Sequence, residues 1–441
     1  MPPSAPRPSR WYRWTVATAA AGIWVGARFH AKVARGWSRR RDLAARYAGW
    51  ASTGRDPGRP LIWFHAPSVG EGLQVKPVLM ALRALHPEWQ LAYTFFSPSA
   101  EAQAQTLPVD FTDYLPLDRP RDVAAALTAL APSALVFGKL DVWPELALAA
   151  AGRAVRLGLI SGTVAPHSSR LRWPVRRWAA PAYAALDRVG AVSDADAKRI
   201  ERLGARPEAI RVTGDTRFDS VVERAARLDR AKEPLASLTA ADRDVFTIVA
   251  GSTWPGDERV LLSAFAGLLT HTGGRARLIL APHEPTVAHL QAVFRAAQRW
   301  QLPPPILLSQ FDRSMTLQQS AIVLVDRLGV LADLYALGAV AYVGGGYHGA
   351  GLHSVLEPAA FGLPVCFGPR WEMSRDADLL IRQGAAVGMP EDGREALLTQ
   401  WIRWRDDAGT RIRAGAAAAA VVKEGTGATR RTVALVRELV L

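Results

Sequence analysis

Short hydrophobic runs recur along the chain from residue 61, and each is followed by a longer stretch with helical spacing. Short, continuously apolar runs that alternate with helices are typical of parallel strands covered on both faces. The pattern therefore predicts an α/β fold. The runs that predict strands are 61–66, 90–96, 134–138, 155–160, 188–192, 245–251, 276–281, 321–326, 339–346 and 363–368.

The alternation is interrupted over 222–243, which reads as an interdomain connection. We therefore predict two doubly wound, Rossmann-like domains facing a central cleft, where the carboxyl ends of the strands would present ligand-binding residues. The first domain is expected over 46–225 and the second over 226–425. A basic and apolar arm over 1–45 precedes them, and a helix over 426–441, which can pack back on the first domain, follows.

The arm holds much of the net charge of +14. Residues 1–50 contain ten Lys or Arg and one acid, Asp42, so the rest of the chain is only mildly basic and a nucleic-acid partner is not expected. The uncharged run 14–27 is shorter than the ~20 residues that span a bilayer. With Trp11, Tyr12, Trp14 and Trp24 it predicts a helix that lies on, or is shallowly anchored in, an anionic membrane surface.

Two other interpretations of the arm stay open: a cleaved signal peptide and an ordinary packed helix. Cys366 is the single cysteine, so no internal disulfide framework can form.

Polar residues with chemical potential follow the predicted strands of the first half. Glu71, in "HAPSVGEG", follows the first strand and could accept a proton from a hydroxyl. Gly70 and Gly72 beside it predict tight backbone turns, although Glu71 could instead belong to the first turn of a helix. Lys139 and Asp141 follow the third predicted strand, 134–138, where they would share a face of an extended segment or form a surface ion pair.

Arg217, in "TGDTRFDS", ends the first half. It could grip an anion in a bidentate way, or pair with Asp219.

The second half offers His283 in "APHEP" and a glycine-rich segment, 344–369. Within it, Ser354 and Glu357 have the spacing of a helix capping box, and Glu357 could accept from sugar hydroxyls. No G-x-G-x-x-G fingerprint follows the first predicted strand, the sequence has no P-loop motif, and the histidines fit no metal-ligand spacing, so neither a metal nor another cofactor is expected.

Taken in order, several motifs resemble those of the Kdo (3-deoxy-D-manno-octulosonic acid) transferase family. They include "HAPSVGEG", "TFFSPSAE", "YLPLD", "VWPEL", "TGDTRFD", "GSTWPGDE", "APHEP" and "HSVLEPAAFGLPVCFGP". The resemblance covers roughly residues 35–435.

The resemblance implies a metal-independent GT-B glycosyltransferase that moves Kdo from CMP-Kdo to a lipid A precursor at the cytoplasmic face of the inner membrane, with inversion. It implies that Glu71 is the general base and that Arg217 stabilises the transition state. Lys139 falls at a third catalytic position. It also implies CMP contacts at Pro282, His283, Leu328, Gly329, Val330, Ser354, Val355, Leu356 and Glu357.

Three positions depart from the family's commoner pattern. Lys139 stands where many members have glutamate, His283 where arginine is usual, and Ser354 where asparagine is usual. A GT-B transferase with another nucleotide sugar or acceptor, and a non-catalytic membrane-associated protein with the same fold, are the alternatives.

Overall fold

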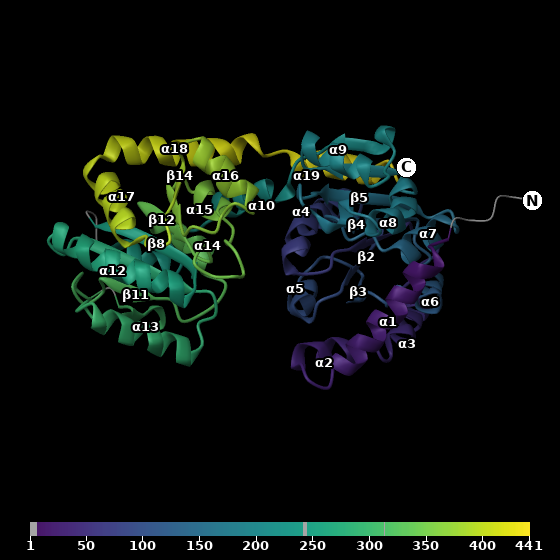
Figure 1. The fold of residues 1–441 in the computed structure, drawn as a ribbon, viewed down its shortest axis with the longest axis horizontal. Coiled ribbons are helices and arrows are strands. Elements are labelled where there is room, and N and C mark those ends of the chain that lie inside the picture. Colours follow the sequence, from purple (N-terminus) through teal and green to yellow (C-terminus); the bar gives the residue numbers. More distant parts are fainter. Residues whose placement is uncertain (1–6, 241–244, 313) are drawn as a thin grey trace, which may run out of the picture. The chain divides into compact units, whose positions relative to one another are not determined.

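The chain forms two compact units in a computed structural model that describes residues 7–240, 245–312 and 314–441. Unit 1 comprises residues up to Asp219 together with Thr426–Leu441, and unit 2 comprises Ser220–Gly425. Figure 1 labels the elements of both units, and each unit is described by itself.

Unit 1 contains a seven-stranded, wholly parallel sheet in the order β3-β2-β1-β4-β5-β6-β7. Its strands are β1 (Leu61–His65), β2 (Gln90–Phe95), β3 (Phe111–Tyr114), β4 (Ala134–Gly138), β5 (Arg156–Gly162), β6 (Arg188–Ala191) and β7 (Ile210–Val212). The helices that accompany them are α4 (Val69–Leu85), α5 (Glu101–Ala104), α6 (Pro120–Leu130), α7 (Pro144–Ala151), α8 (Val175–Ala184) and α9 (Asp194–Arg202).

The strand order reverses between β1 and β4, which lie side by side although two strands separate them in the sequence. At such a reversal the connections leave toward opposite faces of the sheet, so a crevice opens at the carboxyl ends of the two strands. The segments that follow β1 and β4 are therefore the first place to look for a site.

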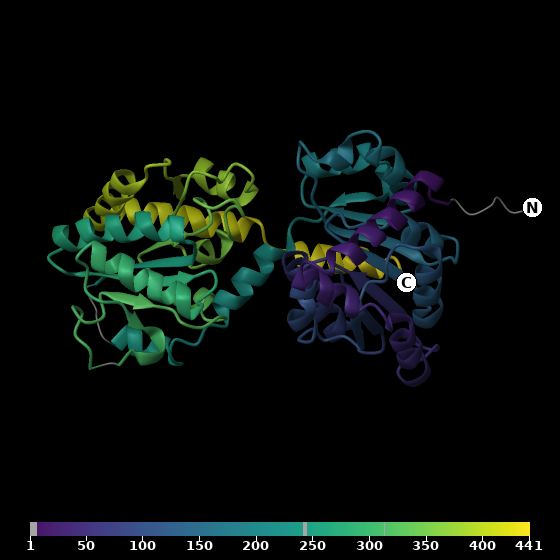
Figure 2. The same cartoon turned by 60° about the horizontal axis from the view of Figure 1, so that its bottom comes forward.

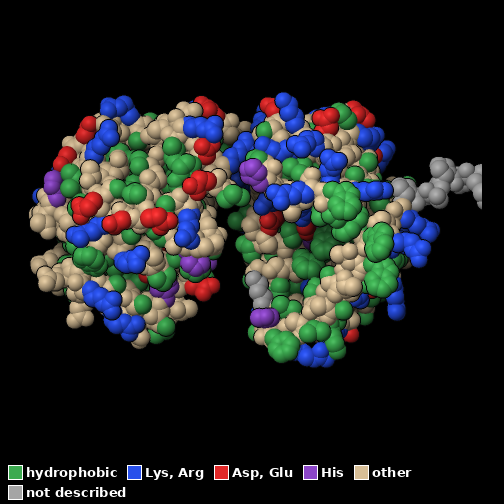
Figure 3. Space-filling view, viewed as in Figure 1, with side chains coloured by type: hydrophobic (Ala, Val, Ile, Leu, Met, Phe, Trp, Pro, Cys, Tyr) green, Lys and Arg blue, Asp and Glu red, His purple; other side chains and the backbone are tan. Residues whose placement is uncertain are grey.

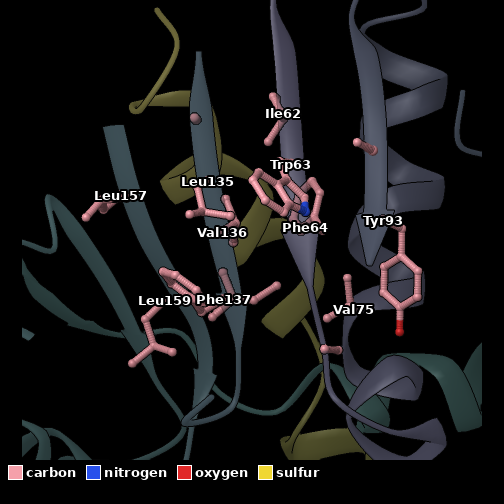
Figure 4. Close-up of a cluster of buried hydrophobic side chains, with 14 of the residues drawn as sticks. Ile62, Trp63, Phe64, Val75, Tyr93, Leu135, Val136, Phe137, Leu157 and Leu159 are labelled. Atoms are coloured by element: carbon pink, nitrogen blue, oxygen red, sulfur yellow. The ribbon is translucent and has the colours of Figure 1, made fainter. Parts of the chain in front are cut away.

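The core of unit 1 lies on β1, β4 and β5, whose side chains are almost all buried (Figure 4). Trp63, Phe64 and Phe137 are among the largest fully buried side chains. The indole of Trp63 donates to the Thr94 hydroxyl at 2.8 Å, so even this buried N–H group is paired. A close-packed sheet of this kind holds the loops at its edge in fixed positions.

Three helices precede the sheet: α1 (Arg10–Gly26), α2 (Ala31–Ser38) and α3 (Leu43–Thr53). The Tyr12 hydroxyl donates to Asp118 at 2.5 Å, and Arg13 binds Glu145 through two hydrogen bonds of 2.7 and 2.8 Å. Asp118 also accepts from two backbone N–H groups at the start of α7. The predicted arm, 1–45, thus contains α1, α2 and the first residues of α3, and α1 is fastened to the rest of unit 1.

Unit 2 repeats the architecture with a second parallel sheet of seven strands, in the order β10-β11-β9-β8-β12-β13-β14. Its reversal lies between β8 and β12. The strands are β8 (Phe246–Thr253), β9 (Ala276–Pro282), β10 (Ile306–Leu307), β11 (Ile322–Leu324), β12 (Val340–Val343), β13 (Val365–Phe367) and β14 (Ala386–Gly388). The helices are α11 (Leu235–Ala240), α12 (Pro255–His271), α13 (Val287–Arg299), α14 (Leu331–Leu334), α15 (Leu356–Ala360), α16 (Arg375–Arg382), α17 (Arg394–Asp406) and α18 (Ala408–Glu424), and α10 (Thr216–Ala226) crosses from unit 1 into unit 2.

The ten predicted strands are all present, and the prediction of an α/β fold with two parallel sheets is confirmed. Four short strands were not predicted: β3, β7, β10 and β14. Part of the predicted connection, 241–244, lies outside the described residues. Among the residues that the structure describes, no helix is long and apolar enough to cross a membrane.

The C-terminal helix α19 (Ala428–Arg437) belongs to unit 1, where it packs on α4 and β6. Figure 2 shows this helix, in yellow, among the elements of unit 1. Its side chains Val433, Leu435 and Val436 are buried in the core of that unit. The carboxylate of Asp219 accepts from the backbone N–H groups of Gly427 at 2.6 Å and Thr429 at 2.7 Å. One carboxylate therefore fixes the entry of the returning chain.

Replacing Asp219 with alanine should lower the free energy of unfolding of unit 1 by about 1–3 kcal/mol, because two N–H groups at the start of α19 lose their acceptor. Chemical denaturation followed by circular dichroism measures the loss. Glu201→Ala, an exposed position on α9, is the matched control. Equal stability of the two variants would contradict a stabilising role for Asp219.

Candidate functional site

Glu71 lies in the first turn of α4, directly after β1 at the reversal of strand order. The helix begins after Ser68, whose hydroxyl donates to Oε2 of Glu71. The Glu71 side chain is only 18% exposed. A carboxylate at this end of a helix is also favoured by the helix dipole.

Lys139 follows β4, the strand next to β1, and its Nζ lies 3.1 Å from Oε1 of Glu71. The residue has a positive φ of 61°, and its backbone N–H donates to Ile160 O at 2.8 Å. This turn of the chain places the ammonium beside Glu71. The structure therefore brings together two of the predicted catalytic residues, 68 positions apart.

The environment of Glu71 keeps its carboxylate ionised. Partial burial alone would raise the pKa of Glu71, but the hydrogen bond from Ser68 and the charge of Lys139 outweigh it and hold that pKa below its ordinary value. At neutral pH the group is thus a proton acceptor, as a general base requires.

The predicted tight turns at Gly70 and Gly72 are wrong, since both glycines lie within α4. Gly72 is needed for space: a Cβ there would lie 2.8 Å from the hydroxyl oxygen of Tyr93 and 2.8 Å from Oε1 of Gln103. No such neighbour lies close to Gly70. The alternative prediction, that Glu71 belongs to the first helical turn, is confirmed.

Asp141 does not pair with Lys139. Its carboxylate lies 3.1 Å from Nε2 of the fully buried His65, accepts from the Trp143 indole at 2.8 Å, and lies 3.5 Å from Arg170. Burial would raise the pKa of Asp141, but these partners lower it below its usual range. Asp141 thus fastens the segment after β4 to β1, and Lys139 pairs with Glu71.

Arg217 is connected to α4 by hydrogen bonds through Asp215 and Gln74. Its guanidinium binds Asp215 at 3.0 and 2.7 Å, and Asp215 lies 3.3 Å from the amide of Gln74. Gln74 is three residues after Glu71 on the same helix. The structure thus shows Arg217 paired with Asp215, whereas Asp219, the alternative partner, accepts from the backbone of the α19 segment.

In unit 2 a group of aromatic rings collects where β8, β9 and β12 end. His283 directly follows β9, and its ring centroid lies 4.8 Å from that of Trp254 and 4.6 Å from that of His353. Trp254 stacks on His348 with centroids 3.8 Å apart, and its indole donates to Nε2 of His353 at 3.2 Å. The arrangement is a wall of flat rings, which suits contact with a planar ligand.

The accepted hydrogen bond identifies Nε2 of His353 as unprotonated. Burial, reinforced by the nearby His283 and His348, lowers the pKa of His353 to about 4. The ring is therefore neutral at physiological pH.

Leu328, Gly329 and Val330 form a second feature of unit 2. Leu328 is 74% exposed, Gly329 has a φ of 88°, and its carbonyl accepts from Arg224 at 3.3 Å. Arg224 also pairs with Asp333 at 3.2 Å. Burial raises the pKa of Glu357, and the positive charge of Arg224 opposes this rise.

The predicted capping box at Ser354 is wrong. The helix α15 begins at Leu356, its N-cap is Val355, and the cap makes no side-chain hydrogen bond. Val355 and Leu356 are fully buried, and Pro282 is buried at the end of β9, so within 354–357 only Ser354 and Glu357 are accessible to a ligand.

Within the described part of the chain, no group of three or more His, Cys, Asp or Glu side chains could hold a metal ion.

Comparison with known proteins shows which family the chain belongs to. The family model described as 3-deoxy-D-manno-octulosonic-acid transferase (kdotransferase) matches residues 35–220. The 3-deoxy-D-manno-octulosonic acid transferase of Bordetella pertussis is 30% identical over 389 residues, which cover 84% of this chain and 86% of that protein. The chain belongs to the Kdo transferase family.

A more distant member of the family, from Haemophilus influenzae, is 24% identical over 407 residues, with 90% of this chain and 91% of that protein covered. The chain is accordingly a glycosyltransferase.

Solved structures support the fold alone. A putative UDP-N-acetylglucosamine 2-epimerase from Listeria monocytogenes has a TM-score of 0.60 and 13% identity, covering 86% of this chain and 96% of its own. A glycosyltransferase from Rickettsia africae has a TM-score of 0.59 and 12% identity, and the match covers 86% of this chain and 98% of that chain. The order of strands and helices within each unit is therefore that of a GT-B-like fold.

Sequence reasoning missed several residues that shape these sites. Ser68 and Gln74 lie three positions before and after Glu71, a spacing that places side chains near one another on a helix. Trp254 and Asp215 lie inside quoted motifs but had no assigned role. Nothing in the sequence indicated that Arg224 contacts the loop at Gly329.

A pH test follows for His353. Because its pKa in the folded protein lies below that of an unfolded histidine, the folded state binds fewer protons between pH 4 and 6.5, and stability should rise with pH across this window. His353→Gln should remove this contribution. As the pH falls from 6.5 to 4, the melting temperature of the wild type should therefore fall more than that of the variant.

Thermal unfolding at several pH values measures the effect, and His167→Gln, at an exposed position of unit 1, is the control. A pH-independent difference would show that His353 titrates normally.

Proposed function

We propose that this protein transfers Kdo from CMP-Kdo to a lipid A precursor in lipopolysaccharide biosynthesis, with inversion at the anomeric carbon. Family membership supports the transferase activity. The observation that carries the mechanism is the ionised carboxylate of Glu71, held at the carboxyl ends of β1 and β4.

In the proposed reaction an acceptor hydroxyl attacks the anomeric carbon of Kdo as the bond from that carbon to the phosphate oxygen breaks. Glu71 takes the hydroxyl proton, and CMP leaves with the bonding electron pair. Ser68 now donates to Oε2 of Glu71, so the acceptor hydroxyl would replace this hydrogen bond. The exchange leaves one proton on Glu71 and no other charge change on the protein.

The two cations have separate roles in the proposal. Lys139 keeps Glu71 ionised before the acceptor arrives. Arg217 would offset negative charge that develops on the phosphate, with Asp215 fixing the guanidinium through paired hydrogen bonds. Asp215 and Gln74 connect that guanidinium to the helix that bears Glu71.

Unit 2 would bind the nucleotide. The wall of rings at His283 and Trp254 offers flat surfaces. Ser354, Glu357 and the exposed turn at 328–330 offer hydrogen-bonding groups. We assign the CMP part of the donor to these segments.

The acceptor is a lipid, and α1 supports contact with a membrane surface. Trp11, Trp14 and Phe29 are 76%, 70% and 75% exposed, and Trp24 is 48% exposed. Figure 3 shows hydrophobic side chains on the surface of unit 1 beside Lys and Arg side chains. Tyr12, predicted to face the interface, is instead bonded to Asp118. We propose a peripheral position on the anionic cytoplasmic face of the inner membrane.

Many basic residues of the arm have partners within unit 1, which the charge count did not anticipate. Arg13 binds Glu145, and Arg35 and Arg39 both bind Glu101. Just after the arm, Arg46 binds Asp113. Arg40 donates to three backbone carbonyls. These arginines hold α1–α3 in place, so fewer of them are available to attract lipid headgroups.

Glu71→Gln should reduce the turnover rate by about 10²–10⁴-fold, since an amide cannot accept the hydroxyl proton. The assay incubates protein with CMP-Kdo and a tetra-acylated lipid A precursor and detects the product by mass spectrometry. Glu208→Gln, at an exposed site of unit 1, is the control.

Wild-type turnover with UDP- or GDP-sugars but not with CMP-Kdo would contradict the proposed donor. Full activity of Glu71→Gln would contradict the proposed base.

Lys139→Met should move the acid limb of the pH–rate profile to higher pH. The ammonium lowers the pKa of Glu71, and that carboxylate must be ionised to act, so its loss raises the pH at which activity falls. Lys198→Met on α9 provides a change of equal charge at an exposed position. An unshifted acid limb in Lys139→Met would mean that another group controls it.

A further inference from the structure

The segment after β5 exposes a second aromatic and basic surface on unit 1. Trp173 is 79% exposed and Val175 38%, and they alternate with the exposed Arg172, Arg176 and Arg177 at the start of α8. An exposed tryptophan among arginines is the composition of membrane-interface segments. The surface is separate from α1 in the sequence and had no assigned role.

A hollow beside this segment concentrates positive charge. Three of its eight lining residues are arginines and none is acidic: Trp173, Arg176, Arg177, Ala180, Pro181, Ala184, Arg202 and Gly204. Among the described residues, Arg176, Arg177 and Arg202 form no ion pair with a carboxylate, in contrast to the paired arginines of the arm.

The floor of the hollow is backbone. Gly204 has a φ of 116°, and a Cβ there would lie 2.8 Å from the carbonyl oxygen of Ala180. The chain after α9 therefore lies directly on α8, which keeps Arg202 beside Arg176 and Arg177 at the rim of one hollow.

This surface is fixed to the same segment that carries Lys139. Arg170 donates to Leu140 O at 2.7 Å and lies 3.5 Å from Asp141, and Tyr183 of α8 donates to Leu140 O at 3.2 Å. The helix α1 is fastened a few residues further on, through Arg13 and Glu145. Two exposed tryptophan-bearing surfaces thus attach to one stretch, 139–145, at the carboxyl end of β4.

We propose that the Trp173 segment and its three-arginine hollow are a second membrane contact, which binds the phosphate of an anionic phospholipid while Trp173 enters the interface. Charge complementarity favours this occupant, because three unpaired guanidiniums face no acid and bind phosphate well. The inference rests on the proposed membrane-bound acceptor. A second contact beside Lys139 would fix the orientation of unit 1 on the bilayer, which α1 alone would leave free to rotate.

The test measures binding of the full-length protein to vesicles by sedimentation, with phosphatidylglycerol in phosphatidylcholine or with phosphatidylcholine alone. The triple variant R176Q/R177Q/R202Q should bind the anionic vesicles more weakly by about 5-fold for each arginine, so by roughly 100-fold in all. Trp173→Ala should weaken binding further, whereas Trp173→Phe should retain most of it.

The matched control is R295Q/R299Q/R403Q, which removes equal charge from exposed positions of unit 2. Thermal unfolding establishes that each variant is folded. Vesicle binding by the arginine triple equal to that of the control triple would overturn the proposal, since net charge alone would then explain the attraction.

A separate arm adds inorganic phosphate alone and follows the melting temperature. A shift that depends on the three arginines, combined with unchanged vesicle binding, would make the hollow a site for a soluble anion and would also overturn the proposal. The measurements use neither Kdo nor nucleotide, so their failure would leave the proposed transfer reaction standing. A wild-type protein that binds vesicles as expected but transfers no Kdo would refute the reaction alone.

Discussion

The contact between Glu71 and Lys139 depends on the order of strands in the first sheet. Because β1 and β4 are neighbours, the segments that follow them meet, and an ammonium comes to lie 3.1 Å from a carboxylate distant in sequence. The other groups serve this contact: Ser68 orients the carboxylate, and His65 holds Asp141 away from Lys139. A proton acceptor that stays charged while largely enclosed is possible only with such partners.

The second sheet uses the same reversal for a different purpose. Between β8 and β12 the chain gathers aromatic rings, with Trp254 and His353 joined by a hydrogen bond that requires an uncharged imidazole. At the reversal of its sheet, unit 1 thus presents an ion pair, and unit 2 presents stacked rings.

Hydrophobic patterning predicted the central strands because they are buried along their whole length. It missed β7, where Arg211 and Val212 are exposed, and β10, which has two half-buried residues, because an edge strand has no continuous apolar run. Position after a strand identified Glu71, Lys139 and His283. The partners of these residues could not be predicted, because pairing depends on which strands become neighbours. A count of charges also cannot reveal that Arg13 and Arg35 form ion pairs with Glu145 and Glu101.

The positive φ of Lys139 implies a conflict between folding and chemistry at that residue. A side chain in the left-handed region costs on the order of 1 kcal/mol, and glycine would avoid this cost. Glycine would also remove the ammonium beside Glu71. Under the proposed mechanism, the most stable residue at position 139 and the most active one are therefore different, and an effort to make this protein more heat-resistant should leave Lys139 unchanged.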